Sequence, residues 1–421
     1  MPQLTHRVRA GYAMGSFVTG AFGTVPGLLL LPYLTDGLAV PAAVAGLLVL
    51  APKAWDVLLN PVAGRVSDRA GARRPFLLRG GATVAVLFAA LFAGPFTGAS
   101  GAVYVALVFM ACATAFAFFQ VPYVAMAAEI TEDYDERTRL MAWRMAFLAL
   151  AILVSGAGAP AVRDLAGGYW AVGAAVGVLI LAGTLATVVG TRGVPVSRRA
   201  PTAATPRELV AAVRGSRPFR LLLTVFVVQA VGLGTMLAGV DYFARLVLGD
   251  QGLQALLFVG FVGPALVVMP LWQRVGRRRG KRYGLVAASL LYAAGMAGLI
   301  AARSAPVGVV LGLVAVGGVG YAGMQVFPMA MLPDVITAEE RGGDARAGLF
   351  SGVWTAGETL GLALGPGVYG LVLALGGYVA STGGAAPQSP GAVLAALIGF
   401  TAIPAVLAVV ALPLLPREET A

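Results

Sequence analysis

The 421-residue sequence predicts an all-α polytopic membrane protein with twelve transmembrane helices in two six-helix halves. Three observations lead to this prediction: the composition, the number of long apolar runs and an internal repeat. Apolar residues make up 59% of the chain and charged residues 12%, with a mean hydropathy of +0.85. Because soluble domains carry about one quarter charged residues, this composition disfavours a soluble protein.

The composition also excludes several kinds of site. Cys112 and His6 are the only cysteine and the only histidine, so neither a disulfide, a thiolate metal cluster nor a His-based catalytic triad can form. We expect no metal site and no cofactor. The net charge of +11 comes from basic residues scattered between apolar runs, which indicates membrane topology and no nucleic-acid partner.

Twelve apolar runs are long enough to cross a bilayer as helices, which takes about 20 residues. The first run follows Arg7 and Arg9, as a signal peptide would, but it is too long and lacks a clear cleavage site. We therefore expect it to be a span. In chain order the predicted spans are 10–34, 41–66, 76–96, 101–128, 141–162, 167–190, 219–248, 253–274, 283–302, 306–333, 346–376 and 391–415.

Arginine and lysine concentrate in alternate connections between the spans, and the opposite connections hold little beyond Arg163, Arg245 and Arg303. The positive-inside rule places the basic connections in the cytoplasm, and an even number of spans then places both termini there. We expect a multi-pass protein of the plasma membrane. The polar connection 191–218 is predicted to be a cytoplasmic linker between an N-terminal half, 1–190, and a C-terminal half, 219–421.

Two segments of the first half recur in the second half. The stretch that begins at Pro61 recurs at Pro270, an offset of 209 residues. Gln120 and Glu129 in the fourth span correspond to Gln325 and Asp334 in the tenth, an offset of 205. These matches indicate duplication of a six-helix unit. Parallel repeated halves with a binding site near the bilayer midplane are typical of the major facilitator fold.

A charged pattern, G-R-x-x-D-R-x-x-x-R-R, follows the second predicted span and contains Gly64, Asp68, Arg69, Arg73 and Arg74. A carboxylate at a helix end that faces arginines can hold two helices together, so we interpret these residues as a candidate cytoplasmic latch. The alternative is that the arginines only anchor the loop in the cytoplasm.

Lys53, Asp56 and Asn60 share one face of the second predicted span. Asp56 is nine residues from Arg65, or about 14 Å along a helix, which is near the middle of the bilayer. Ionisable residues at that depth are costly and commonly functional. We predict a cation-coupling site at Asp56 and Asn60, with Lys53 available to a solute. The alternative is a Lys53–Asp56 ion pair that only fixes helix packing.

Glu358 is the other carboxyl residue near mid-depth, in the eleventh span. It could carry a proton, bind solute or pair with Lys53, and the alternative is a neutral side chain hydrogen-bonded to a neighbouring helix. The repeat-related amides Gln120 and Gln325 suit a hydroxyl-rich solute, although amides also link helices to one another.

Three further side chains are candidates for solute binding. Arg144 lies in the inner third of the fifth span, where snorkelling to the interface is the alternative role. Tyr123 and Trp354 could stack on a sugar ring, and packing or anchoring at the interface is the alternative for both.

These segments resemble the glycoside–pentoside–hexuronide:cation symporters, the branch of the major facilitator superfamily that includes the melibiose carrier. Lysophospholipid carriers are a more distant likeness. The resemblance implies cation-coupled solute uptake by alternating access. The matching motifs are Lys53-Ala-Trp-Asp-Val-Leu-Leu-Asn-Pro61, Val121-Pro122-Tyr123, Asp133-Tyr-Asp-Glu-Arg137 with Arg144, Ala330-Met-Leu-Pro-Asp334 and Gly376-Gly-Tyr378.

The chain departs from this family's pattern at the positions that bind ion and sugar. Asp56 matches the first of two span-two carboxylates, whereas Asn60 replaces the second and Leu59 replaces the amide before it. Gly20 and Gln120 stand where the family has sugar-binding acids, and a glutamate stands where span eleven usually has a lysine. Sodium prefers several oxygen ligands, while a proton needs one titrating group. The departures therefore favour proton coupling, or loss of coupling.

We expect a secondary active transporter, and not an enzyme, that moves a sugar, glycoside or related small solute together with a cation. A proton fits the departures from the family pattern better than sodium does. We further expect a monomer in the lipid bilayer. The alternatives are an exporter or lysolipid-type carrier of broader specificity and a membrane receptor that does not transport.

Overall fold

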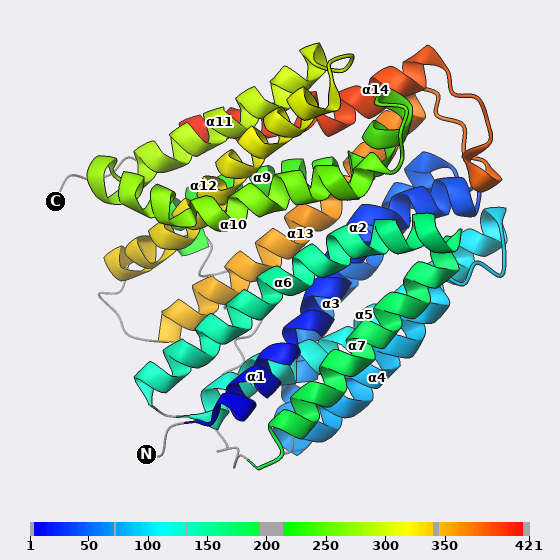
Figure 1. Ribbon diagram of the computed structural model, residues 1–421. Coiled ribbons are helices and arrows are strands. Elements are labelled where there is room, and N and C mark those ends of the chain that lie inside the picture. Colours follow the sequence, from blue (N-terminus) through cyan, green and yellow to red (C-terminus); the bar gives the residue numbers. More distant parts are fainter. Residues whose placement is uncertain (1–3, 71–72, 132, 194–213, 340–344, 416–421) are drawn as a thin grey trace. The chain divides into compact units, whose positions relative to one another are not determined.

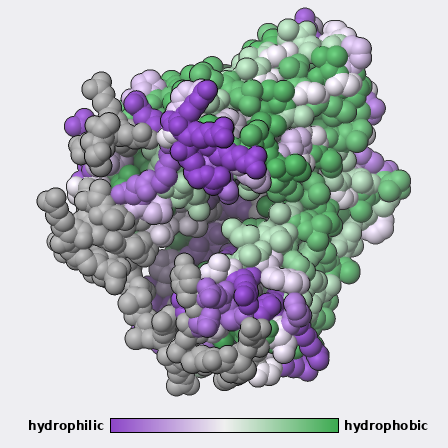
Figure 2. Space-filling model, turned by 60° about the vertical axis from the view of Figure 1, so that its left-hand side comes forward, coloured by the Kyte–Doolittle hydropathy of each residue, from purple (hydrophilic) through white to green (hydrophobic). Residues whose placement is uncertain are grey.

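The computed structural model describes residues 4–70, 73–131, 133–193, 214–339 and 345–415. Within this part, twelve helical segments are long and apolar enough to cross a membrane, which confirms the predicted fold class and number of spans. Hydrophobic residues cover much of the surface seen in Figure 2, and hydrophilic residues gather toward one side of that view. This surface is suited to a lipid environment.

The chain divides into two compact units. Unit 1 takes residues 1–41, 51–203 and 380–386, and unit 2 takes residues 42–50, 204–379 and 387–421. The predicted halves, 1–190 and 219–421, remain a prediction, and 194–213 of the predicted linker lie outside the described residues. The helix Ala42–Ala70 contributes its first turns to unit 2, where an added Cβ on Gly370 would lie 2.4 Å from the backbone oxygen of Ala42.

Unit 1 contains the first six spans except residues 42–50, which are the first turns of the second span. The first span combines two helices and a π-helical turn, because the helix breaks at Gly15. The elements are α1 (His6–Met14), α2 (Ser16–Pro32), η1 (Tyr33–Gly37), α3 (Ala42–Ala70), α4 (Arg73–Leu91), α5 (Gly98–Ile130), α6 (Tyr134–Ala166), α7 (Tyr169–Gly190) and η3 (Thr382–Gly384).

Unit 2 contains the last six spans. Its elements are α9 (Arg217–Tyr242), η2 (Phe243–Val247), α10 (Leu253–Arg279), α11 (Lys281–Ala301), α12 (Val307–Glu339), α13 (Ala345–Leu375), α14 (Pro390–Phe400), α15 (Ala402–Val410) and η4 (Leu412–Leu414). The predicted span 391–415 is therefore broken at Thr401, because Pro404 cannot donate a hydrogen bond to the carbonyl of Phe400.

The same helix pairs form in each unit, as expected from the repeat. In unit 1, α4 packs on α5 and α7, and α2 packs on α6 (Figure 1). In unit 2, the corresponding helix α11 packs on α12 and α15, and α9 packs on α13. The π-helical turns η1 and η2 also end corresponding spans, the first and the seventh. Each unit thus repeats one arrangement of six spans.

Candidate functional site

In unit 1, Asp56 lies on α3 with only 6% of its surface exposed. Its Oδ1 atom has no hydrogen-bond partner among the described residues. Asn60, one turn further along α3, also keeps its Oδ1 atom without a described partner. These two oxygens share a helix face, so they could accept hydrogen bonds from a solute or coordinate a cation.

Gln120 lies on α5 at a neighbouring depth. The indole of Trp55 on α3 donates to Thr114 Oγ1 on α5 at 3.1 Å, and Gly64 faces Val121. The two helices therefore run side by side, with Asn60 and Gln120 between these contacts. Gln120 Oε1 has no described hydrogen-bond partner. Three side-chain oxygens of unit 1, from Asp56, Asn60 and Gln120, thus have no described hydrogen-bond partner.

Lys53 interacts electrostatically with Asp56, but the two side chains form no ion pair within the described part of the chain. Instead, Lys53 Nζ donates to the backbone oxygen of Phe22 at 3.4 Å and lies 4.7 Å from the centre of the Phe22 ring. The alternative that Lys53 and Asp56 form a direct packing bridge is therefore wrong for this conformation.

Tyr123 is fully buried at the junction of α1, α2, α5 and α6. Its hydroxyl donates to the backbone oxygen of Tyr12 at 3.0 Å, and its ring stacks on the Tyr12 ring. The guanidinium of Arg144 lies 5.3 Å from the centre of the Tyr123 ring. In this conformation Tyr123 packs helices together and offers no surface for a sugar, whereas half-buried Arg144 keeps Nε without a described partner.

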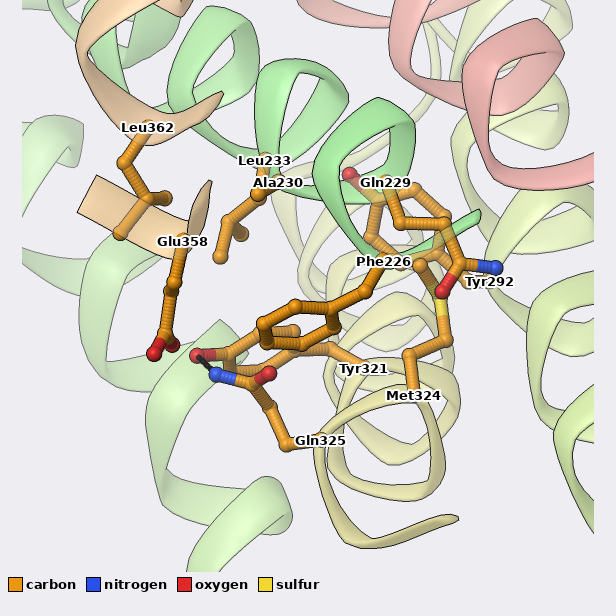
Figure 3. A pocket seen from close by; sticks show the side chains of 10 residues that line it. All are labelled: Phe226, Gln229, Ala230, Leu233, Tyr292, Tyr321, Met324, Gln325, Glu358 and Leu362. Carbon is orange, nitrogen blue, oxygen red and sulfur yellow. Dashed lines mark hydrogen bonds between the residues drawn. The ribbon is translucent and has the colours of Figure 1, made fainter. Parts of the chain in front are cut away.

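In unit 2, a small cavity lies between α9, α11, α12 and α13 and contains Glu358. Its volume is about 20 Å³, which is enough for one water molecule. The carboxyl group of Glu358 points toward the Tyr321 hydroxyl and the Gln325 amide (Figure 3). Gln325 Nε2 also donates to Tyr321 Oη at 2.9 Å. Glu358 has no ion-pair partner among the described residues.

The sequence predicted Glu358 and Gln325 but missed the other polar groups of this cavity. Tyr321 could have been found, because it precedes Gln325 by four residues and so lies on the same helix face. Gln229, an amide within the seventh span, also lines the cavity and donates to Ser289 Oγ at 2.9 Å. Trp354 lies one turn before Glu358, is 2% exposed and stacks on Phe226, so packing dominates its surroundings.

The predicted latch contains an ion pair, but with a different carboxylate. Arg73 at the start of α4 binds Glu129 at the end of α5, with Nη2 and Oε1 2.7 Å apart, and donates to Ser67 Oγ at 2.8 Å. The side chain of Asp68 lies outside the described residues. The repeat offered a signal for Glu129, because it corresponds to Asp334, which pairs with Lys281.

The other latch residues differ in their roles. Arg74 donates to the backbone oxygen of Thr191, and Arg69 is exposed. An added Cβ on Gly64 would lie 3.6 Å from Val121, an ordinary contact, so sterics do not require glycine there. A second buried ion pair that the sequence analysis missed joins Arg9 of α1 to Glu136 of α6 at 2.9 Å.

Among the described residues, no group of three or more His, Cys, Asp and Glu side chains is placed to hold a metal ion. The polar groups at span depth are instead carboxyl, amide, hydroxyl and cationic groups in both units. Such groups suit reversible binding of a small polar solute and movement of a proton.

Comparison with known proteins identifies the family of the chain. The chain is 27% identical over 423 residues to the uncharacterized symporter YnaJ of Bacillus subtilis, which covers 96% of this chain and 89% of that protein. It is 25% identical over 411 residues to the glucuronide carrier protein homolog of Escherichia coli, covering 90% and 86%. A putative 2,3-dihydroxypropane-1-sulfonate exporter of Salmonella typhimurium is 26% identical, covering 70% and 67%.

Solved structures show the same fold at low sequence identity. The nucleoside transporter NupG matches with a TM-score of 0.71 at 15% identity, covering 97% of this chain and 99% of that chain. A bacterial homolog of the lysosomal transporter Spinster matches with a TM-score of 0.71 at 13% identity, covering 97% and 93%. The family model described as MFS/sugar transport protein matches residues 11–417. The chain therefore belongs to the sugar-transport family of the major facilitator superfamily, whose members are membrane transporters and not enzymes.

Proposed function

We propose that this protein is a proton-coupled symporter of a sugar, glycoside or related small solute that works by alternating access. One observation carries the proposal: each unit keeps one carboxyl group at span depth outside any described ion pair, Asp56 in unit 1 and Glu358 in unit 2. A charged side chain at that depth is energetically costly, and such residues commonly have a function. Two such groups are more than helix packing requires.

The surroundings of Glu358 support a proton as the coupling ion. Its cavity has room for one water molecule, and its neighbours are the Tyr321 hydroxyl and the Gln325 amide. This set can exchange a proton through water but offers few oxygen ligands for sodium. Sodium remains the alternative in unit 1, where Asp56, Asn60 and Gln120 together present three oxygens without described partners.

The solute is proposed to bind the polar groups of unit 1. Gln120 and Asn60 can accept hydrogen bonds from hydroxyl groups, and Lys53 and Arg144 can donate to oxygens. The relative named as a glucuronide carrier homolog supports a hydroxyl-rich solute. Lys53 and Arg144 would bind its carboxylate if the solute is acidic. Protonation would neutralise Glu358 during the transport cycle.

The test uses purified protein in liposomes, with an imposed pH gradient and a panel of glucuronides, neutral glycosides and nucleosides. An inward proton gradient is expected to drive accumulation of at least one solute, and a sodium gradient alone is not. Glu358→Gln should abolish accumulation but preserve exchange of internal for external solute, because exchange requires no release of the proton. The Asp56→Asn variant in the same assay measures the contribution of Asp56 to coupling separately from that of Glu358.

Asp250→Asn is the matched control, because Asp250 is exposed and caps a turn by accepting a hydrogen bond from the Gly252 backbone, which asparagine can also accept. This control should transport as the parent does. Full accumulation by Glu358→Gln would contradict the coupling role of Glu358. Accumulation driven by sodium with no response to pH would contradict proton coupling while leaving symport intact.

A second candidate is export of an anionic solute. The relative named as a sulfonate exporter and the cation Arg144, with Nε lacking a described partner, favour it. Inverted membrane vesicles distinguish the two directions. An exporter would accumulate a sulfonated or carboxylated solute in inverted vesicles under a proton gradient of the cellular sign, and a symporter working in uptake would not.

A further inference from the structure

A groove of about 500 Å³ lies along the surface of unit 1, between α4 and α5. This volume is within the range of ligand-binding pockets, about 300–1,000 Å³. Its walls are almost entirely apolar, with Phe76 and Leu87 on α4 and Ala111 and Phe118 on α5. Both helices are long and apolar enough to cross a membrane, so we take the groove to face the acyl chains of the bilayer.

A single charged side chain lies in this groove. Arg79 is exposed, lines the groove and is six residues beyond Arg73, the first residue of α4. Six residues correspond to about 9 Å along the helix, so a guanidinium on its flexible stem can reach the membrane interface. Within the described residues, Arg79 forms no ion pair or hydrogen bond.

The nearby basic residues differ from Arg79 because their charges are already engaged. Arg73 is bound by Glu129, and Arg74 donates to the Thr191 backbone. An arginine inside a membrane span without a carboxylate is costly, and an anionic group from outside the chain would reduce that cost. The polar group nearest in sequence along the groove is the exposed hydroxyl of Thr83, one turn further along α4. It can donate a hydrogen bond to the same anion.

We propose that this groove is a binding site for an anionic phospholipid, with the lipid phosphate on Arg79 and one acyl chain along α4 and α5. The charge selects the head group, because basic pockets near the membrane interface bind anionic lipids. The long apolar groove favours a ligand with an acyl chain over a soluble phosphate, because only the acyl chain can bury apolar surface there. The site is separate from Asp56, Gln120 and Glu358 and does not depend on the proposed transport activity.

Native mass spectrometry of the purified full-length protein tests the site. The protein is titrated with phosphatidylglycerol, with zwitterionic phosphatidylethanolamine and with glycerol phosphate alone. The parent protein should retain phosphatidylglycerol in preference to the other two. Arg79→Gln should bind phosphatidylglycerol about fivefold more weakly, the loss expected for one basic residue at a membrane surface. Arg79→Lys keeps the charge and should retain the preference.

Two further variants test the effect of losing a charge elsewhere and the effect of filling the groove. Arg278→Gln removes another exposed arginine, at the end of α10 in unit 2, and should leave lipid binding unchanged. Ala111→Phe fills the exposed apolar wall and should weaken phosphatidylglycerol binding, while the preference over phosphatidylethanolamine remains. Each variant is first shown to be monodisperse with a parent-like unfolding midpoint.

The proposal is overturned if Arg79→Gln retains phosphatidylglycerol as well as the parent, or if the parent binds phosphatidylethanolamine equally well. Equal binding of glycerol phosphate would overturn the acyl chain's place in the groove. Uniform binding of every lipid to parent and variants would identify the contacts as an unselective lipid annulus, which also contradicts a built site.

Discussion

At the scale of single residues, the two units contain corresponding ion pairs that differ in how deeply they are buried. Arg73 and Glu129 form a buried pair at the ends of α4 and α5, with side chains 10% and 6% exposed. The corresponding pair in unit 2, Lys281 and Asp334, is 39% and 59% exposed. Removing one partner of a buried pair leaves an uncompensated charge, whereas an exposed pair contributes little.

Arg73→Gln is therefore expected to destabilise the protein by about 3–5 kcal/mol, because Glu129 would stay buried without its partner. Lys281→Gln should cost at most about 1 kcal/mol. Thermal unfolding of the purified variants measures the difference. The double variant Arg73→Gln/Glu129→Gln should recover part of the loss, and equal shifts for Arg73→Gln and Lys281→Gln would refute this ranking.

The candidate site was only partly predictable at this scale. Asp56 and Glu358 lie within long apolar runs of the sequence, and the structure places both in membrane-length helices. Their depth in the bilayer stays a prediction from the rise of a helix. The side chains that contact the charged residues could not be predicted from positions along a helix. Lys53 binds the Phe22 backbone instead of Asp56, and Arg73 binds Glu129, 56 residues away in the chain.

At the scale of helices, close packing depends on particular glycines. A Cβ added to Gly320 of α12 would lie 2.4 Å from the backbone nitrogen of Tyr292 on α11. The two backbones can approach that closely only because glycine has no side chain, as in other membrane helix pairs. Gly312, two turns earlier on α12, is exposed and faces open space.

We expect Gly320→Ala to destabilise the packing of α11 and α12 by about 1–3 kcal/mol, the usual cost of overpacking. Gly312→Ala is the matched control on the same helix and should cause no loss, because alanine is the better helix former. The midpoints of thermal unfolding in one detergent provide the comparison. A Gly320→Ala midpoint equal to that of the control would show that the two helices can separate without loss.

Helix breaks were the least predictable elements. The run 391–415 is apolar apart from Thr401, and Pro404 was the signal in the sequence for a break at that residue. The glycine at the Gly15 break has a tertiary reason, because a Cβ there would lie 2.4 Å from the ring of Tyr123 on α5. A sequence shows which residues favour a break, but the neighbouring helix decides whether the break forms.

At the scale of the whole molecule, the predicted topology gives a direct labelling test. Cys112 is fully buried, so Cys112→Ser provides a background free of other thiols. Ser304→Cys, in the exposed connection between α11 and α12, should react with a membrane-impermeant maleimide in intact cells. Arg278→Cys, at the end of α10, should react only after the cells are permeabilised. The reverse pattern would place both termini outside the cytoplasm and contradict the positive-inside assignment.

The sequence by itself determined the class of the protein, the number of spans, the repeat and the spans that hold the two carboxyl residues. These properties depend on composition, on run length relative to bilayer thickness and on the rise of a helix, all of which act along the chain. The tertiary structure alone decided that Tyr321 and Gln325 surround Glu358, that Glu129 neutralises Arg73 and that a groove exposes Arg79. Those outcomes depend on which faces of distant helices meet, because side chains from separate spans become neighbours only when the helices pack.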